Sequence, residues 1–407
     1  MTKPVEHFPT PVDHIRRFHD ELTAIRRDIH RHPELAFQEQ RTSDLVAATL
    51  QGFGIEVHRG LGGTGVVGTI PGRSRDSGRA VGLRADMDCL PMHEAGDKPH
   101  RSVHEGRMHA CGHDGHTTML LGAARYLNET RRFDGTVYLI FQPAEEHGAG
   151  GERMLRDGLF ERFPADEVYA LHNWPELPPG QIAVRPGPMM AATDEIDIVV
   201  RGKGGHAAMP HLAVDPVVVT AHIITALQTI ASRTIAPVDA VVVTIASMQT
   251  SQVGPHNVIP DAVSLRGTVR TFRPGTRDLA ERRVSEIAEG LAAAFGATAE
   301  VKYHRGYPAT VNSVAEAEFA AQVGEYVFGP GNVMRDVDPT MGGEDFAYLL
   351  QEKPGAYVFL GQGGAPGGCL LHNPRYDFND DVIPLGAGYL AALAEAALPL
   401  ESTAEDD

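Results

Sequence analysis

The order in which strand-like and helix-like segments follow one another is the strongest constraint on the fold of this 407-residue chain. Apolar strand patterns alternate with helical patterns in the first part of the sequence, and the same alternation returns over residues 317–398. Such alternation predicts an α/β layered domain with a largely parallel sheet. The strand-like segments are residues 66–72, 79–88, 135–146 and 167–174, and the helix-like segments include residues 13–32, 42–54 and 116–130.

The sequence between these two parts follows a different pattern. After a Gly/Pro break near residue 188, strand and helix patterns appear in the order β-α-β-β-α-β over about residues 189–304. This order is typical of the ferredoxin-like fold, and the chain is long enough for two domains. We therefore expect a discontinuous domain from residues 1–188 and 305–407, with a ferredoxin-like domain of residues 189–304 inserted into it.

The charge and the cysteine content limit the partners and the location of the protein. Its 36 Lys and Arg residues against 53 Asp and Glu residues give a net charge of −17, which disfavours binding to nucleic acid. The first residues lack the apolar region of a secretory signal, and no apolar run is long enough for a membrane span. Three cysteines are too few for a disulfide framework. We expect a cytoplasmic protein with no membrane or nucleic-acid partner.

The densest group of possible metal ligands lies in residues 109–116. His109, Cys111, His113 and His116 offer imidazole and thiolate groups, which bind zinc-like ions well. The intervening glycines allow tight bends that bring alternate side chains to one point. The alternative is a glycine-rich turn with solvated histidines. The concentration of donors directly before a helix favours a metal site.

Two adjacent carboxylates follow the strand pattern at residues 135–146. Neighbouring side chains of an extended segment point to different sides. One of Glu145 and Glu146 can therefore bind a metal while the other acts as a general base toward a water. An exposed acidic loop is the alternative. The position at the carboxyl end of a strand favours a functional site.

Further polar residues end other strand-like segments. His172 and His372 are ordinary loop histidines when taken alone, and they gain weight as ligands beside the two clusters above. Asp86 and Asp88 form a carboxylate pair that can bind a metal or orient a ligand histidine from behind. A capping or loop role is the alternative for this pair.

Glycine-rich or polar turns supply the remaining candidates. His206 lies in such a turn, where it can donate a hydrogen bond to a developing oxyanion or simply be a turn residue. Asn257 is a similar candidate for contact with a substrate. Gly342 and Gly343 would let the backbone approach a ligand closely.

These motifs together resemble one known family. The segments LRADMDCLPM, MHACGHDGHTTMLLGAA, FQPAEEHGAGGERM, GGHAAMPH, HNVIPD and MGGEDFAY occur in this order. They are similar to the hippurate hydrolase and N-acyl-L-amino-acid amidohydrolase family, which includes the plant indole-3-acetyl-amino-acid hydrolases. The resemblance extends from HRHPELAFQE to LHNPRYDFNDD, nearly the whole chain.

The resemblance implies two divalent metal ions. Zinc, manganese, cobalt and nickel all suit mixed thiolate, imidazole and carboxylate ligands. It implies Glu145 as general base and acid, and Asp88 as an aspartate behind a ligand. Many members of the wider superfamily have His at the position of Asp86 and a bridging aspartate at that of Cys111. The implied metal ligands are Cys111, His113, Glu146, His172 and His372.

For the inserted domain, the resemblance implies a lid and dimerisation role, and hence a homodimer or higher homo-oligomer. His206 would reach the active site of a neighbouring subunit. Asn257 would contact the carboxylate or carbonyl of the substrate. Gly342 and Gly343 remain candidates for substrate binding.

The sequence thus predicts an amidohydrolase that cleaves N-acyl amino acids of the hippurate or N-acetyl type into a carboxylic acid and a free amino acid. A dipeptidase, a carbamoylase and an N-acetyl-diaminopimelate deacetylase are alternatives on the same fold. A hydrolase with the Cys111 thiol as nucleophile is a further one. A binding protein with a purely structural metal is less favoured, because Glu145 accompanies five candidate ligands and structural sites are closed and four-coordinate.

Overall fold

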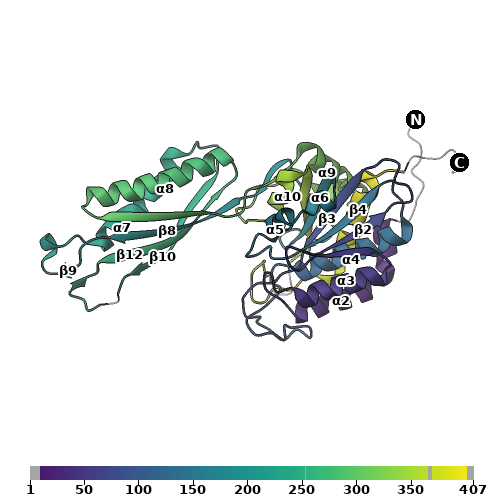
Figure 1. Cartoon of the computed structure of the whole chain (residues 1–407), viewed down its shortest axis with the longest axis horizontal. Coiled ribbons are helices and arrows are strands. Elements are labelled where there is room, and N and C mark those ends of the chain that lie inside the picture. The colour runs from purple at the N-terminus through teal and green to yellow at the C-terminus, as the bar shows by residue number, and fades with distance from the viewer. Residues whose placement is uncertain (1–9, 253, 365–368, 401–407) are drawn as a thin grey trace. The chain divides into compact units, whose positions relative to one another are not determined.

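A computed structural model describes residues 10–252, 254–364 and 369–400 of the chain (Figure 1). The chain divides into two compact units, each described here by itself. The first unit consists of Met1–Met189, Val311–Asp338 and Asp345–Asp407, and the second of Met190–Thr310 and Pro339–Glu344. The second unit therefore ends later than the expected residue 304 and gains a separate segment. That segment is attached because the Ala191 backbone N–H donates to the carbonyl oxygens of Thr340 and Gly342.

An eight-stranded sheet forms the centre of the first unit, in the order β1-β2-β4-β3-β5-β16-β6-β15. The four central strands β4, β3, β5 and β16 pair in parallel, whereas β1, β2 and β4 pair antiparallel at one side. The predicted α/β fold with a largely parallel sheet is confirmed. The strands are β1 (Glu56–Leu61), β2 (Gly65–Pro71), β3 (Ala80–Asp86), β4 (Thr136–Gln142), β5 (Glu167–Trp174), β6 (Ile182–Ala183), β15 (Val333–Met334) and β16 (Gly355–Gly361).

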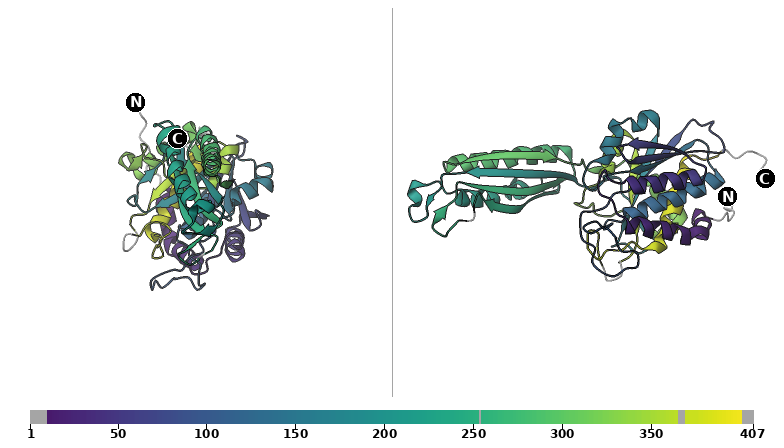
Figure 2. Two further views of the ribbon diagram at one scale, coloured as in Figure 1. Left: turned by 90° about the vertical axis from the view of Figure 1, so that its left-hand side faces the viewer. Right: turned by 60° about the horizontal axis from the view of Figure 1, so that its bottom comes forward.

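Helices cover both faces of this sheet. In Figure 1, α2, α3 and α4 lie on one side of it, and α5 and α10 lie on the other. Figure 2 shows α2 and α4 side by side, and α11 packs beside α4 against β3 and β5. The helices are α1 (Pro11–Ile15), α2 (His19–Arg31), α3 (Gln40–Gly52), α4 (His113–Thr130), α5 (Gly150–Arg156), α6 (Leu159–Arg162), α9 (Val314–Phe328), α10 (Phe346–Glu352) and α11 (Ile383–Ala397).

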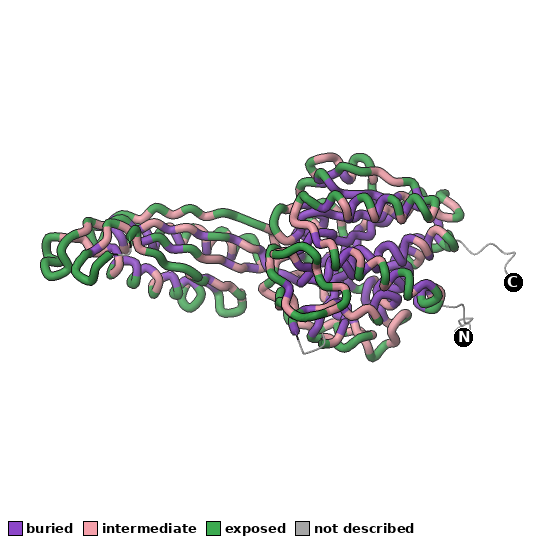
Figure 3. The backbone as a smooth tube through the Cα atoms, turned by 90° about the horizontal axis from the view of Figure 1, so that it is seen from below, coloured by how far each residue is buried: buried purple, intermediate pink, exposed green. Residues whose placement is uncertain are grey.

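Burial on both faces explains the composition of the central strands. Every residue of β3 and β16 is buried, as parallel strands between two helical layers require. Figure 3 shows this buried core in purple. Into such a core β3 brings two charged side chains, Arg84 and Asp86, and buried charges need specific partners.

The second unit has the ferredoxin-like order of elements. Its four-stranded sheet has the order β10-β12-β8-β13, and every pair in it is antiparallel. Helices α7 and α8 pack against each other and supply apolar side chains to one core with the sheet. The elements are β8 (Ala192–Arg201), β9 (Gly205–His206), α7 (Pro216–Leu227), β10 (Val241–Thr250), β11 (Val258–Ile259), β12 (Ala262–Thr271), α8 (Pro274–Ala294) and β13 (Thr298–Arg305).

Two short strands, β7 (Gly187–Met190) and β14 (Thr310–Asn312), lie where the chain passes from one unit to the other. Among the residues that the structure describes, no helix is both long and apolar enough to cross a membrane.

Candidate metal centre

The carboxyl ends of three neighbouring parallel strands bring the predicted site residues of the first unit together. Strands β3, β4 and β5 are adjacent in the sheet, so the segments that follow them meet at one edge. Asp88 follows β3, the Glu145–Glu146 pair follows β4, and His172 lies near the end of β5. The amino-terminal end of α4, with Cys111 and His113, lies at the same edge.

The turn before α4 depends on a glycine. Gly112 has a φ of 102°, in the left-handed region, and α4 begins at the next residue. A Cβ atom at this position would lie 2.1 Å from Oδ1 of Asn173, so no other residue fits. Because of this turn, Cys111 and His113 flank one point, and the Cys111 sulfur lies 3.4 Å from Nε2 of His172.

The five predicted ligands form two groups of possible donor atoms, each within 4.8 Å of one another. One group joins Cys111, His113 and His172, and the other joins Cys111, Glu146 and His372. In the second group, His372 Nε2 lies 3.3 Å from Glu146 Oε1. Cys111 belongs to both groups, which is the arrangement expected of a ligand shared by two cations.

The hydrogen bonding of these side chains fits metal ions. Within the described part of the chain, neither buried ring nitrogen of His113 makes a well-aligned hydrogen bond, and the same holds for Oε1 of Glu146. Their nearest charged neighbours are 3.3 Å away, namely Asp88 for His113 and His372 for Glu146. Buried polar atoms are normally satisfied. Thiolate, imidazole and carboxylate donors with unmet bonding capacity are suited to divalent transition-metal ions.

Asp88 supports the site from behind. Its two carboxylate oxygens accept hydrogen bonds from the backbone N–H groups of Glu145 and Glu146, at 2.9 and 3.0 Å. Its Oδ1 atom also lies 3.3 Å from Nδ1 of His113. The buried Asp88 carboxylate thus fixes the loop that carries both glutamates. The same carboxylate also contacts Nδ1 of His113, as carboxylates commonly do behind a metal-binding histidine.

Asp86 belongs to a separate network beside the donors. Its Oδ1 atom lies 2.6 Å from Nδ1 of His116, and its Oδ2 atom lies 3.7 Å from Nε2 of His113. The other ring nitrogen of His116 lies 2.6 Å from Oδ1 of Asn173. Asp86, His113 and His116 form another group of possible donors, but His116 is held by Asp86 and Asn173 on both sides.

Glu145 lies beside the donors. Its Oε2 atom is 4.0 Å from Nε2 of His113, and its Oε1 atom accepts a 3.4 Å hydrogen bond from the backbone N–H of Asp345. The preceding Ala144 has a φ of 54° and His372 a φ of 61°. Left-handed backbone at non-glycine residues is unfavourable, and it concentrates where a site requires a particular side-chain direction.

The protonation state of His172 suits a ligand. Burial, reinforced by the nearby His116, lowers the pKa of His172 well below its ordinary value, so the ring is neutral. Its Nδ1–H donates to the backbone oxygen of Asn173 at 2.7 Å. The lone pair of Nε2 therefore faces the Cys111 sulfur and is available to a cation.

The pKa values of Cys111 and His113 show how the charges around the site control the protonation of these two side chains. Burial and the carboxylates of Glu146 and Glu145 raise the pKa of the Cys111 thiol well above its ordinary value. Burial lowers the pKa of His113, but carboxylates led by Asp86 outweigh it and raise that pKa to about 10. A divalent cation bound here would favour the thiolate and the neutral imidazole instead.

Four predicted site residues belong to the second unit. His206 is exposed in β9, which pairs with β11, and the Ala207 N–H donates to the backbone oxygen of the exposed Asn257 at 2.9 Å. Gly343 packs tightly, since a Cβ atom there would lie 2.2 Å from the Thr193 side chain, and Gly342 is exposed. The structure thus gives Gly343 a packing reason for being glycine.

Several residues that complete the site were not predicted. Arg84, Asn173 and Asp345 bind the carboxylates, rings and loops described above. A usable signal existed for Arg84, because a charged residue two positions before Asp86 lies on the same side of the strand. Asp345 lies in the MGGEDFAY motif, but this motif did not indicate its role, and Asn173 carries no comparable signal.

Comparison with known proteins places the chain in a family. The sequence profile of Peptidase family M20/M25/M40 matches residues 82–396. A hippurate hydrolase from Campylobacter jejuni is 40% identical over 374 residues, which cover 92% of this chain and 96% of that protein. An N-acetylcysteine deacetylase from Bacillus subtilis is 38% identical over 389 residues, which cover 94% of this chain and 98% of that protein.

A solved structure agrees with these sequence matches. A dinuclear metal-binding peptidase of the M20 family from Bacillus subtilis superposes with a TM-score of 0.81 at 34% identity, and the match covers 94% of this chain and 99% of that one. The profile match spans most of the chain, and the chain holds clustered metal donors at the edge of its large sheet. This chain belongs to Peptidase family M20/M25/M40 and is a metal-dependent amidohydrolase.

Proposed function

We propose that this protein hydrolyses the amide bond of N-acyl amino acids and releases a carboxylic acid and a free amino acid. Two divalent cations would be held by Cys111, His113, Glu146, His172 and His372, with Glu145 as general base and acid. The observation that carries the proposal is the position of the Glu145 carboxylate beside two donor groups that share Cys111. The similar hippurate hydrolase and N-acetylcysteine deacetylase support this substrate class.

The chain's own residues have defined tasks in this reaction. Bound cations would supply a water of lowered pKa and a Lewis acid for the acyl oxygen. Glu145 accepts a proton from the attacking water and returns it to the amine nitrogen as the C–N bond breaks. Asp88 accepts a hydrogen bond from the backbone N–H of Glu145 and contacts the His113 ring. It therefore fixes the position of the base relative to one ligand.

The second unit is proposed to act as lid and oligomerisation domain. Its β10 is an edge strand, and Met248 on it is 53% exposed. An unpaired strand edge with an exposed apolar side chain is suited to pairing with a second copy. Asn257, Gly342 and Gly343 are proposed to contact the substrate.

His206 is proposed to act at the active site of a neighbouring subunit. Mixing His206→Ala with Glu145→Gln tests this directly, provided that each variant alone is inactive; an active His206→Ala would show that His206 has no role in catalysis. If His206 acts on the partner, each mixed dimer has one complete site, and random mixing restores about a quarter of wild-type activity. No recovery above the separate variants, in a mixture shown to exchange subunits, would mean that His206 acts within its own chain.

A substrate panel with metal depletion tests the function. The panel consists of benzoylglycine, N-acetylcysteine, carbamoyl amino acids, N-acetyl-diaminopimelate and dipeptides. The hydrolysis of each compound is measured with the untreated protein, with the chelated protein and with the chelated protein after metal is restored. The proposal expects the highest kcat/KM for a benzoyl or acetyl amino acid, lost on chelation and regained with zinc, manganese, cobalt or nickel. Preference for a carbamoyl substrate, the diaminopimelate derivative or a dipeptide would select one of the alternatives.

Two other outcomes would reject the mechanism. Turnover that survives complete metal removal would favour the Cys111 thiol as nucleophile. Absence of turnover with metal bound would favour a non-catalytic binding protein.

A further inference from the structure

A buried guanidinium joins the two halves of the candidate site. Arg84 lies in the fully buried strand β3, and only 2% of its surface is exposed. Its Nη1 donates to Asp86 Oδ2 at 2.7 Å and its Nη2 to Asp345 Oδ1 at 3.0 Å. Its Nε donates to the amide oxygen of Gln142 at 2.9 Å. Three donors of one rigid group thus connect the end of its own strand β3, the end of β4 and the residue that precedes α10.

One branch of this network leads to the general base. Besides Arg84, the Asp345 carboxylate accepts hydrogen bonds from the side-chain amide of Gln142 at 2.7 and 2.9 Å and from the backbone N–H of Gly151 at 2.8 Å. The backbone N–H of the same Asp345 donates to Oε1 of Glu145. The side chain of Asp345 is therefore anchored while its main chain contacts the base.

The other branch leads to the ligands. The second oxygen of Asp86 binds His116 at 2.6 Å, and the oxygen that binds Arg84 lies 3.7 Å from the ring of His113. His116 in turn contacts Asn173, which follows the ligand His172. A displacement of Arg84 would thus be transmitted to the face of the site where the cations are expected.

We propose that Arg84 is a positioning residue. It fixes the position of the general base Glu145 relative to the metal-ligand histidines, through Asp345 on one side and through Asp86 on the other. This inference rests on the proposed function for the role of Glu145. A lysine could not replace Arg84, because an ammonium is a single point of charge and cannot reproduce a planar fork that binds three partners.

A purely stabilising role explains the arrangement less well. A buried ion pair loses much of its Coulombic gain to desolvation, and apolar residues of similar size are often as stable or more so. A fully buried strand would accommodate an apolar side chain at position 84. The charged network is therefore better explained by the geometry that it imposes.

The experiment compares Arg84→Lys, Asp345→Asn and Asp86→Asn by steady-state kinetics and by Co(II) spectroscopy. The absorption bands of bound Co(II), including the thiolate band from Cys111, report the ligand geometry whether or not the protein turns over. Arg79→Lys is the matched control. Arg79 directly precedes the same strand at its opposite end, and it binds Glu167 at 3.0 Å and the backbone oxygen of Ala397 at 2.8 Å.

The expected results separate the two branches. Arg84→Lys lowers kcat about 10–100-fold with little change in KM and alters the Co(II) bands, as removal of a residue behind metal ligands does. Asp345→Asn lowers kcat but leaves the Co(II) bands unchanged. Asp86→Asn alters the bands. Arg79→Lys changes neither quantity.

Clear results would overturn the inference. These are a kcat within twofold of wild type with unaltered Co(II) bands for Arg84→Lys, or Co(II) bands that change as much in Asp345→Asn as in Arg84→Lys. If Arg84→Lys does not fold, Asp345→Asn and Asp86→Asn decide: unaltered Co(II) bands in Asp86→Asn, or a kcat of Asp345→Asn within twofold of wild type, would overturn the inference. If the wild type hydrolyses none of the substrates, the proposed function fails, but altered Co(II) bands in Arg84→Lys and Asp86→Asn would still support the ligand branch.

Discussion

Cys111 contributes its sulfur to both donor groups, so this side chain decides whether two cations can be held close together. Sulfur is a soft ligand that favours zinc and similar ions over magnesium or calcium. It also makes the site sensitive to oxidation and to thiol reagents once a metal holds the thiolate. At the residue scale, we therefore propose that this thiol binds the metal ions and that the Glu145 carboxylate transfers protons.

Changing Glu145 to Gln separates these two roles. We expect Glu145→Gln to retain its metal and to lose about 10²–10⁴-fold in kcat, because a general base contributes on this order. Cys111→Ala, in contrast, should lose metal and activity together. Metal content by elemental analysis and kcat on the best substrate measure both effects. Near-normal turnover of Glu145→Gln would show that another group is the base.

Trp174 offers a spectroscopic probe, because it is the only tryptophan in the sequence. Its ring lies 6.3 Å from that of His172 and stacks on Phe359 at 4.1 Å. We expect tryptophan fluorescence to change saturably as Co(II) is added to metal-free protein. Trp174→Phe should remove the signal and leave Co(II) binding intact. Emission that stays constant while Co(II) binds would mean that the cations are held elsewhere.

At the scale of secondary-structure elements, the site depends on how α4 begins. The sequence predicted a helix over residues 116–130, whereas α4 begins at His113. The earlier start follows from the left-handed Gly112, which allows the helix to begin directly after the turn. The donor-rich motif of residues 109–116 was predicted as a turn before a helix, but the candidate ligand His113 is already the first residue of that helix.

Alanine at Gly112 tests this turn. We expect Gly112→Ala to destabilise the protein by more than about 3 kcal/mol, or to prevent metal binding, because left-handed strain and overlap with Asn173 add together. Gly63→Ala is the matched control. Gly63 has a φ of 88°, and a Cβ atom added there would meet nothing within 4 Å, so this variant should lose only about 1–2 kcal/mol. Equal losses in urea denaturation would show that the Asn173 contact is unimportant.

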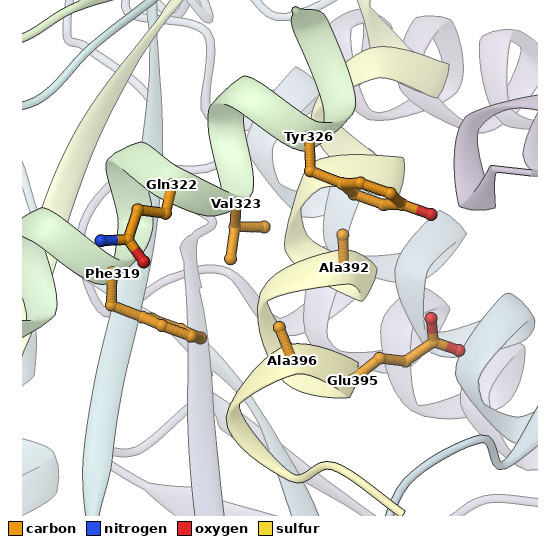
Figure 4. Close-up of a pocket in the computed structure, with 7 residues that line it drawn as sticks. All are labelled: Phe319, Gln322, Val323, Tyr326, Ala392, Glu395 and Ala396. Carbon is orange, nitrogen blue, oxygen red and sulfur yellow. The ribbon is translucent and has the colours of Figure 1, made fainter. Parts of the chain in front are cut away.

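The interface of α9 and α11 provides a test of pH dependence. Glu395 lines a groove of about 440 Å³ between these helices, with Phe319 and Tyr326 nearby (Figure 4). Burial raises its pKa to about 7, against the opposing effects of Tyr126 and Arg132. Between its unfolded pKa near 4.5 and this value, the folded state binds more protons, so the free energy of unfolding decreases as pH rises through this window.

We therefore expect Glu395→Gln to be more stable than wild type at pH 8 by on the order of 1–3 kcal/mol. The two proteins should differ least below pH 4.5, where Glu395 is protonated in both the folded and the unfolded state. Urea denaturation at pH 5 and pH 8 measures the effect. A difference that does not grow with pH would contradict the raised pKa.

Strand β5 was predicted at the residues where it occurs, since its apolar run is bounded by polar turns on both sides. Strand β1 was not predicted, because half of the residues of this edge strand are exposed and it contains charged residues. In the same way, motifs indicated Cys111 and Glu145, whereas Arg84 and Asp345 interact across 261 positions of sequence. Such a contact leaves no local pattern.

At the scale of the whole molecule, the candidate ligands come partly before and partly after the inserted unit in the sequence. Four of them precede it, and His372 follows it in the chain. The site is complete only when both parts of the first unit have folded together, which the long-range hydrogen bond from the His372 N–H to the Ala110 carbonyl oxygen illustrates. The sequence predicted this interrupted arrangement from the change in pattern near residue 188, although the segment Pro339–Glu344 was not assigned to the inserted unit.

The most direct test is a crystal structure with anomalous diffraction data, from protein saturated with zinc. We predict two anomalous peaks that share the Cys111 sulfur at about 2.3 Å, one also bound by His113 or His172 and the other by Glu146 or His372 at about 2.0–2.2 Å. The Glu145 carboxylate should lie next to the two metal ions without coordinating either of them. A single, fully closed four-coordinate zinc, or peaks away from Cys111, would contradict the account.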